Sequence, residues 1–179
     1  MPCYHPVSAW RLISGEVVFK ERGDIVASLF LPCGRCVGCR LERSRQWAVR
    51  MMHEASLYDM SSFVTLTYDD LNIDDKRSLV YSDFQKFMKR LRKHRGPTRF
   101  FVAGEYGSGL QRPHWHCALF GYWPADAKHW RKGASGHVLY RSAVLDRLWG
   151  MGHVEVGTLT FEGAAYMARY VMEKVTGVS

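Results

Sequence analysis

Two β-forming runs, "RFFVAG" (99–104) and "HWHCALFG" (114–121), lie in the middle of the chain on either side of the glycine-rich stretch "GEYGSGLQRP". Aromatic and branched side chains favour strands, and a short glycine-containing connection favours an antiparallel hairpin. Such a hairpin requires an antiparallel sheet around it. It also brings Glu105 near His114 and His116.

The remaining segments predict further strands and several helices. Strands are expected at "SFVTLTY" (62–68), at "GHVEVGTL" and within residues 16–31, where two short strands flank a turn. Helices are expected from about residue 38 to 58, behind a capping box of Ser82 and Gln85, at 142–150, and over "FEGAAYMARYVMEKV" with Thr160 as its N-cap. The pattern predicts a single α+β domain over residues 1–179, with helices packed mainly on one face of an antiparallel sheet and residues 1–40 as a cysteine-containing N-terminal segment.

The charge balance favours a polyanionic partner, although a basic domain of this size also occurs without one. Lys and Arg exceed Asp and Glu by 25 to 17, which gives a formal net charge of +8. The apolar runs are shorter than the roughly 18 residues that a membrane span needs, and the N-terminus has no secretory apolar segment. We therefore expect no membrane partner, and we expect the protein to remain in the compartment in which it is made.

The paired histidines predict a metal site. Residues two apart in a strand point to the same face, so His114 and His116 project together. With Glu105 they form a three-ligand set that leaves coordination positions open, which suits Mg²⁺ or Mn²⁺ acting on a phosphate oxygen. The alternative is a pair of partly buried, hydrogen-bonded histidines.

The final helix presents two tyrosines one turn apart, Tyr166 and Tyr170. At ~100° per residue they lie away from the apolar stripe that contains Ala164 and Ala168. We expect them to be nucleophiles, activated by a cation or by Lys174 and Arg169 on the adjoining flank. The alternative is a pair of tyrosines at the rim of the core.

The cysteines predict a second metal site. Cys33, Cys36 and Cys39 in "CGRCVGC", with Cys3 as a remote fourth ligand, suit structural Zn²⁺. Unmetallated thiols and an iron–sulfur cluster remain alternatives. The basic helix at 82–95 is either a solvated face or the wall of a groove that neutralises phosphates.

Taken together, "FVTLTY", "RPHWHCALFG" and "YMARYVMEK" resemble the three ordered motifs of HUH endonucleases that initiate rolling-circle replication. Two tyrosines four residues apart resemble the initiators of Microviridae phages, and "PCGRCVGCR" is similar to the cluster of their gokushovirus branch. The resemblance implies a five-stranded antiparallel sheet with the active site on its open face. It also implies a cation held by the histidine pair, with Glu105 of "GEYG" as third ligand. Arg169 departs from the lysine that many relatives carry after the first tyrosine.

The expected function is that of a site-specific single-stranded DNA endonuclease and ligase. A tyrosine nicks a replication origin, leaving a 5′-phosphotyrosine and a free 3′-hydroxyl for rolling-circle replication. The alternatives are a zinc-stabilised single-stranded DNA-binding module without catalysis, and a relaxase or transposase of the same superfamily. The sequence contains no GxxxxGK[ST] motif, so we expect host polymerase and helicase partners in the bacterial cytoplasm. The chain ends soon after the tyrosine helix, as an excised catalytic domain would.

Overall fold

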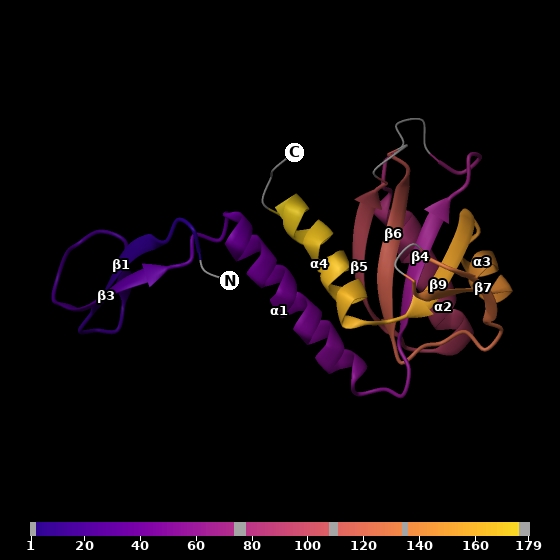
Figure 1. Cartoon of the computed structure of the whole chain (residues 1–179), viewed down its shortest axis with the longest axis horizontal. Helices are drawn as coiled ribbons and strands as arrows, with labels where there is room; N and C mark the ends of the chain where they lie inside the picture. The colour runs from indigo at the N-terminus through magenta and orange to yellow at the C-terminus, as the bar shows by residue number, and fades with distance from the viewer. Residues whose placement is uncertain (1–2, 74–77, 108–110, 134–135, 176–179) are drawn as a thin grey trace.

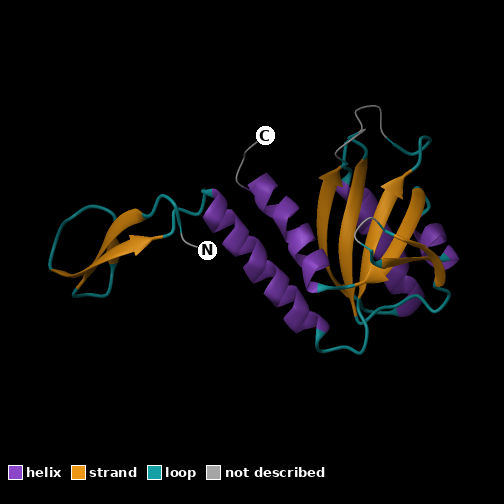
Figure 2. Cartoon of the chain, in the orientation of Figure 1, coloured by secondary structure: helices purple, strands orange, loops and turns teal. Residues whose placement is uncertain are grey.

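The computed structural model describes residues 3–73, 78–107, 111–133 and 136–175, with side chains up to Val171. Figures 1 and 2 show a large sheet flanked by helices and a small sheet at the far end of a long helix. The strands are β1 (Val7–Leu12), β2 (Val17–Val18), β3 (Ile25–Leu31), β4 (Ser62–Tyr68), β5 (Arg99–Tyr106), β6 (Pro113–Phe120), β7 (Lys128–Lys132), β8 (Val138–Arg141) and β9 (Gly152–Thr158). The helices are α1 (Val37–Ala55), α2 (Tyr81–Arg95), α3 (Ala143–Trp149) and α4 (Phe161–Val175).

The large sheet is antiparallel throughout and has six strands in the order β5-β6-β4-β9-β8-β7. The α+β class and the β5–β6 hairpin are confirmed, but the expected number of five strands is not. Strand β7 accounts for part of the difference. All five of its residues are exposed at the sheet edge, so "KHWRK" has none of the apolar alternation that marks a half-buried strand.

Helices cover both faces of this sheet, so the prediction that they pack mainly on one face is wrong. Cys117 of β6 packs in a core cluster with α2 and α3, whereas the next residue, Ala118, packs in a second cluster with α1 and α4. Adjacent residues of a strand point to opposite faces. Because β6 is buried on both sides, each face needs its own layer of helices.

Helices α1 and α4 lie side by side over the face that carries the histidines (Figure 1). This arrangement also contradicts the expected open face, because α4 lies over part of the site. None of the helices in the described part of the chain combines the length and the apolar composition needed to cross a membrane.

The small sheet has the order β2-β1-β3 and projects from the start of α1 (Figure 2). The predicted hairpin within residues 16–31 is wrong in its pairing, because β1 lies between β2 and β3 and bonds to both. Strand β1 was not expected. The N-terminal segment therefore forms a sheet of its own rather than an edge of the large one.

Of the two predicted helix caps, Thr160 is confirmed, and the helix expected at 142–150 also forms, as α3, with Ser142 as a cap that was not predicted. The Ser142 hydroxyl accepts a hydrogen bond from Leu145 N, and the Thr160 hydroxyl accepts one from Gly163 N. The capping box is wrong, because α2 begins one residue before Ser82, and its N-cap, Val80, has no capping side chain.

Candidate metal and tyrosine site

The register of the large sheet brings Glu105, His114 and His116 together. Glu105 lies directly opposite His114 on the β5–β6 hairpin, and His116 lies two residues further along β6. The Glu105 Oε2 atom is 2.9 Å from His116 Nε2 and 3.5 Å from His114 Nε2. One candidate ligand atom from each residue lies within 4.8 Å of the other two. The predicted ligand set therefore forms one cluster.

The second nitrogen of each imidazole fixes the direction of its ring. His114 Nδ1 donates to the Arg112 carbonyl at 3.0 Å, because a carbonyl can only accept. His116 Nδ1 lies 3.0 Å from the Thr65 hydroxyl, which can either donate or accept. Both Nε2 atoms consequently face Glu105. Hydrogen bonds of this kind orient histidine ligands of metal ions.

Burial and hydrogen bonding set the charges of the cluster. Burial lowers the pKa of His116, so its imidazole is neutral, as a metal ligand must be. Burial alone would raise the pKa of Glu105, but hydrogen bonds from His116, Tyr170 and Tyr166 outweigh this and hold its pKa at about 2. One carboxylate and two imidazoles fit a divalent cation with open coordination positions.

Tyr166 reaches the same carboxylate from α4. Its hydroxyl donates to Glu105 at 2.9 Å from both Oε1 and Oε2, and its ring packs edge-on against His116 with centroids 5.4 Å apart. The Tyr170 hydroxyl, one turn on, donates to Tyr166 Oη at 3.2 Å. The two predicted tyrosines thus both meet the candidate metal ligands through Glu105.

The buried stripe of α4 places Tyr166 at its border. Ala164, Met167 and Ala168 are buried, and Tyr166 is 38% exposed. Gly163 lets the first turn of α4 lie close to β4, because a Cβ at this position would be in tight contact with the Phe63 ring, at 3.1 Å. This close approach of the first turn of α4 to β4 lets Tyr166 reach Glu105 on β5 and His116 on β6.

The charge of Glu105 disfavours ionisation of Tyr166. Burial raises the pKa of this phenol, and its hydrogen bonds to Tyr170 and Glu105 raise it further. A phenol in this environment needs positive charge nearby to act as a nucleophile. Arg169 is exposed, and the side chain of Lys174 lies outside the described residues, so its predicted role stays a prediction.

Two contacts of His116 were not anticipated from the sequence. Thr65 bonds His116, and the Phe63 ring lies 5.3 Å from the His116 ring. Both belong to the strand "SFVTLTY", and Thr65 pairs directly with His116 across β4 and β6. The alternation of side chains along this strand was the available signal, because residues two apart in a strand, such as Phe63 and Thr65, lie on the same face of the sheet.

The face that carries the histidines continues across β9 towards a basic edge. Glu155 pairs with Thr65, which places it on the same face as His116. Arg131 bonds Glu155 at 3.0 Å, and the guanidinium carbon atoms of Arg131 and Arg141 lie 4.5 Å and 4.6 Å from the Trp130 ring centroid. We call Trp130, Arg131 and Arg141 the basic-aromatic edge.

The basic helix predicted at 82–95 lies on the other face. Phe84, Phe87 and Leu91 of α2 pack in the cluster that contains Cys117, opposite the face of the histidines. The basic side chains of α2 therefore do not line the site formed by Glu105, His114 and His116.

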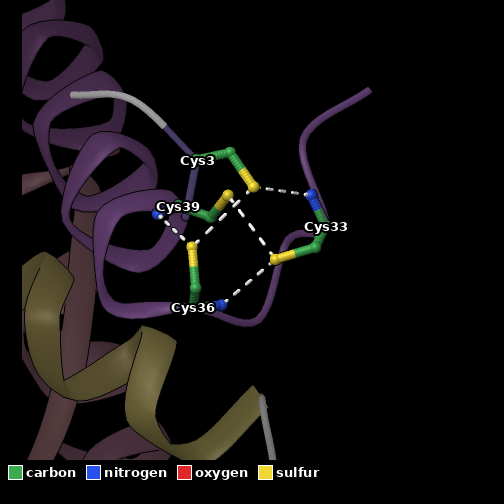
Figure 3. A group of neighbouring side chains, drawn as sticks. All are labelled: Cys3, Cys33, Cys36 and Cys39. Atoms are coloured by element: carbon green, nitrogen blue, oxygen red, sulfur yellow. Dashed lines mark hydrogen bonds between the residues drawn. The ribbon is translucent and has the colours of Figure 1, made fainter. Parts of the chain in front are cut away.

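The four N-terminal cysteines meet at the start of α1, away from the histidine cluster. Figure 3 shows the sulfur atoms of Cys3, Cys33, Cys36 and Cys39 facing one another. The fifth cysteine, Cys117, is fully buried in the core of the large sheet. The structure thus holds two separate groups of candidate metal ligands.

Comparisons with known proteins agree on one family. The model of the family "Replication-associated protein ORF2/G2P" matches residues 61–175. The replication-associated protein VP4 of Bdellovibrio phage phiMH2K is 37% identical, over 98% of this chain and 59% of the relative. The replication-associated protein ORF2 of Spiroplasma virus 4 is 32% identical, over 98% of this chain and 62% of the relative.

A third relative, the replication-associated protein ORF4 of Chlamydia phage 1, is 37% identical over 80% of this chain and 38% of its own length. No solved structure gives a significant match. The chain spans about three fifths of the first two relatives, at 59% and 62% of their lengths. Because the matched region includes the entire histidine, glutamate and tyrosine cluster, the chain belongs to the ORF2/G2P family of replication-associated proteins.

Proposed function

We propose that this protein is a nicking and joining endonuclease that acts on single-stranded DNA at a phage replication origin, with Tyr166 as the first nucleophile. One observation carries the proposal. The Tyr166 hydroxyl lies 2.9 Å from both oxygens of Glu105, and that carboxylate is grouped with His114 and His116 as a three-ligand set. A phenol beside such a ligand set is the arrangement that metal-assisted phosphoryl transfer to tyrosine requires.

DNA as the substrate is supported by the surface next to the site. Strand β8, which carries Arg141, is three strands from β6 in the large sheet. At about 4.8 Å per strand the two are about 14 Å apart. A few nucleotides of extended strand span that distance. Guanidinium groups neutralise phosphates, and an exposed indole ring stacks bases without reading their sequence.

The chemistry exchanges one phosphodiester for another. The Tyr166 oxygen bonds to phosphorus, the bond from phosphorus to the 3′-oxygen breaks, the phenolic proton passes to solvent, and the leaving 3′-oxygen gains a proton. A divalent cation bound by Glu105, His114 and His116 would supply charge stabilisation to the phosphate oxygens. No nucleotide cofactor is consumed, because the phosphotyrosine ester retains the energy of the cleaved bond for rejoining.

Tyr170 is the second nucleophile in this proposal. Its hydroxyl donates to Tyr166 Oη at 3.2 Å and also hydrogen-bonds to Glu105, so both phenols lie at the ligand set. Once Tyr166 carries a DNA 5′ end, Tyr170 is the phenol at the site that has not reacted. A second cut by Tyr170 releases one replicated strand and leaves the next one attached.

The role in replication rests on the relatives, whose printed names describe replication-associated proteins of phages. In our proposal the free 3′-hydroxyl primes a host polymerase, a host helicase unwinds the template, and the protein works in the cytoplasm of the infected cell. Lys174, four residues after Tyr170, is proposed to assist by its charge.

The proposal is tested by incubating the protein with Mn²⁺ and single-stranded oligonucleotides that carry the origin region of the phage. Labelling the 5′ or the 3′ end distinguishes the two products, because only the fragment downstream of the nick becomes attached to protein. We expect a covalent adduct on the 3′-labelled fragment and a free 5′-labelled fragment. Binding without any adduct, in the presence of Mn²⁺ or Mg²⁺, would instead identify a non-catalytic single-stranded DNA-binding module.

A further inference from the structure

The four N-terminal cysteine sulfurs are arranged as ligands of a single ion. Cys33 Sγ lies 4.0 Å from Cys39 Sγ, and Cys36 Sγ lies 3.9 Å from Cys3 Sγ. All four lie within 4.8 Å of one another (Figure 3). Four thiolates at about 2.3 Å from one tetrahedral zinc ion lie about 3.8 Å apart. The distances of 3.9 Å and 4.0 Å are close to this value.

We propose that Cys3, Cys33, Cys36 and Cys39 bind one Zn²⁺ ion, which fastens the small sheet to the start of α1. The spacing separates this proposal from the alternatives. Sulfur ligands of an iron–sulfur cluster are held further apart by the several metal atoms between them. A disulfide requires sulfur atoms about 2.05 Å apart, and none of these cysteines is paired in that way.

Backbone N–H groups point at the sulfur atoms, as thiolate charge requires. Cys33 N donates to Cys3 Sγ at 3.2 Å, and Cys36 N donates to Cys33 Sγ at 3.4 Å. Cys36 Sγ accepts from two amides, those of Tyr4 at 3.4 Å and Cys39 at 3.5 Å. These bonds stabilise negative sulfur over a neutral thiol.

The positions of the ligands indicate what the ion connects. Cys3 precedes β1, Cys33 follows β3, and Cys36 and Cys39 lie at the N-cap and in the first turn of α1. An ion bound to all four closes the base of the small sheet and joins it to the helix. The four cysteines then occupy all four coordination positions of a tetrahedral ion, which is typical of a structural site.

The small sheet needs such a cross-link because it has little apolar core of its own. Phe19, Val26 and Phe30 are exposed, at 63%, 58% and 75%. Small domains that bury little apolar surface are commonly stabilised by metals or disulfides. Without the ion, the three strands have few contacts to offset the entropy of ordering them.

The first test is the metal content of the whole purified chain, measured by elemental mass spectrometry. We expect one zinc per chain and strong visible absorption of tetrahedral cobalt thiolate after exchange with Co²⁺. Cys36→Ser is the informative variant, because serine keeps the N-cap of α1 but removes a thiolate. It should lose the zinc and the cobalt absorption while circular dichroism shows the helices retained.

Two matched variants serve as controls. Cys117→Ala removes the buried cysteine outside the cluster and should keep the zinc. His116→Ala disrupts the other candidate metal site and should also keep it. Iron with acid-labile sulfide, disulfides detected by mass spectrometry in freshly reduced protein, or failure of the reduced wild-type chain to bind added Zn²⁺ would each overturn the proposal. Zinc retained in Cys36→Ser and Cys3→Ser would overturn it as well.

Discussion

The two groups of candidate metal ligands differ in how the fold assembles them. Three of the cysteines lie within one short stretch at the start of α1, and their spacing in the sequence nearly determines their geometry. Glu105, His114 and Tyr166 come instead from β5, β6 and α4, so only the register of the large sheet and the packing of α4 bring them together.

The difference extends to what each group can do. Four cysteine sulfurs occupy all the coordination positions of a tetrahedral ion and leave none for a substrate, which suits a structural role. Two imidazoles and one carboxylate leave positions open, and a hydroxyl group lies next to them. A closed site joins pieces of backbone, whereas an open site next to a nucleophile can take part in a reaction.

The largest effect that separates the two sites is expected from Tyr166→Phe. Loss of the phenolic oxygen removes the first nucleophile, so nicking should fall by at least about 1000-fold, as for other catalytic nucleophiles. The content of bound zinc should not change. Product formation in a gel assay with labelled oligonucleotide measures the loss, and Tyr170→Phe is the matched control. Equal loss in both single variants would contradict the order of attack.

His116→Ala should reduce nicking by about 100-fold or more, because it removes a proposed ligand of the cation. Binding of single-stranded DNA should change by only a few-fold, since the basic-aromatic edge is untouched. Fluorescence anisotropy with Mn²⁺ present measures binding, and the gel assay measures nicking. Retention of wild-type nicking would exclude His116 as a ligand.

The sequence predicted which candidate ligands lie together better than it predicted the surroundings of either group. His114 and His116 share a face because side chains alternate along a strand, and Tyr166 and Tyr170 share a side of α4 because they are one turn apart. Thr65 could not be named in advance, since its contact with His116 depends on the pairing of β4 with β6. Strands β7 and β8 and the double layer of helices were missed because they depend on long-range packing.

Thr65→Val tests one of these unforeseen contacts. The substitution keeps the shape of the side chain but removes the hydroxyl that bonds His116 Nδ1 at 3.0 Å. Loss of such a hydrogen bond to a metal ligand weakens metal binding by about 10- to 100-fold. The Mn²⁺ concentration that gives half-maximal nicking should rise by this factor. Thr67→Val, on the same face of β4, is the control and should have little effect.

Trp130→Ala should weaken single-stranded DNA binding by about fivefold, which corresponds to about 1 kcal/mol of lost base stacking. The dependence of affinity on salt should remain as in the wild type, because no charge is removed. Arg131→Ala should instead reduce the slope of log affinity against log salt concentration. Unchanged affinity in both variants would show that DNA does not cross the basic-aromatic edge.

Removal of the ion proposed at the cysteines should have the most local effect. A chelator that competes with the cysteine thiolates for the metal ion should raise hydrogen exchange, measured by mass spectrometry, in β1, β3 and the first turn of α1. Strands β4 and β6 should keep their protection, because they lie in a core that contains no cysteine ligand. Uniform loss of protection across the chain would mean that the two regions fold as one unit.

The most direct test of the central claim is to locate the covalent bond to DNA. Trypsin cleaves after Arg147, Arg169 and Lys174, so Tyr166 lies in the peptide 148–169 and Tyr170 in the peptide 170–174. After a single nicking reaction with Mn²⁺ and nuclease trimming, mass spectrometry should find the nucleotide on peptide 148–169. A nucleotide found mainly on another peptide, or none on either despite efficient nicking, would contradict attack by Tyr166.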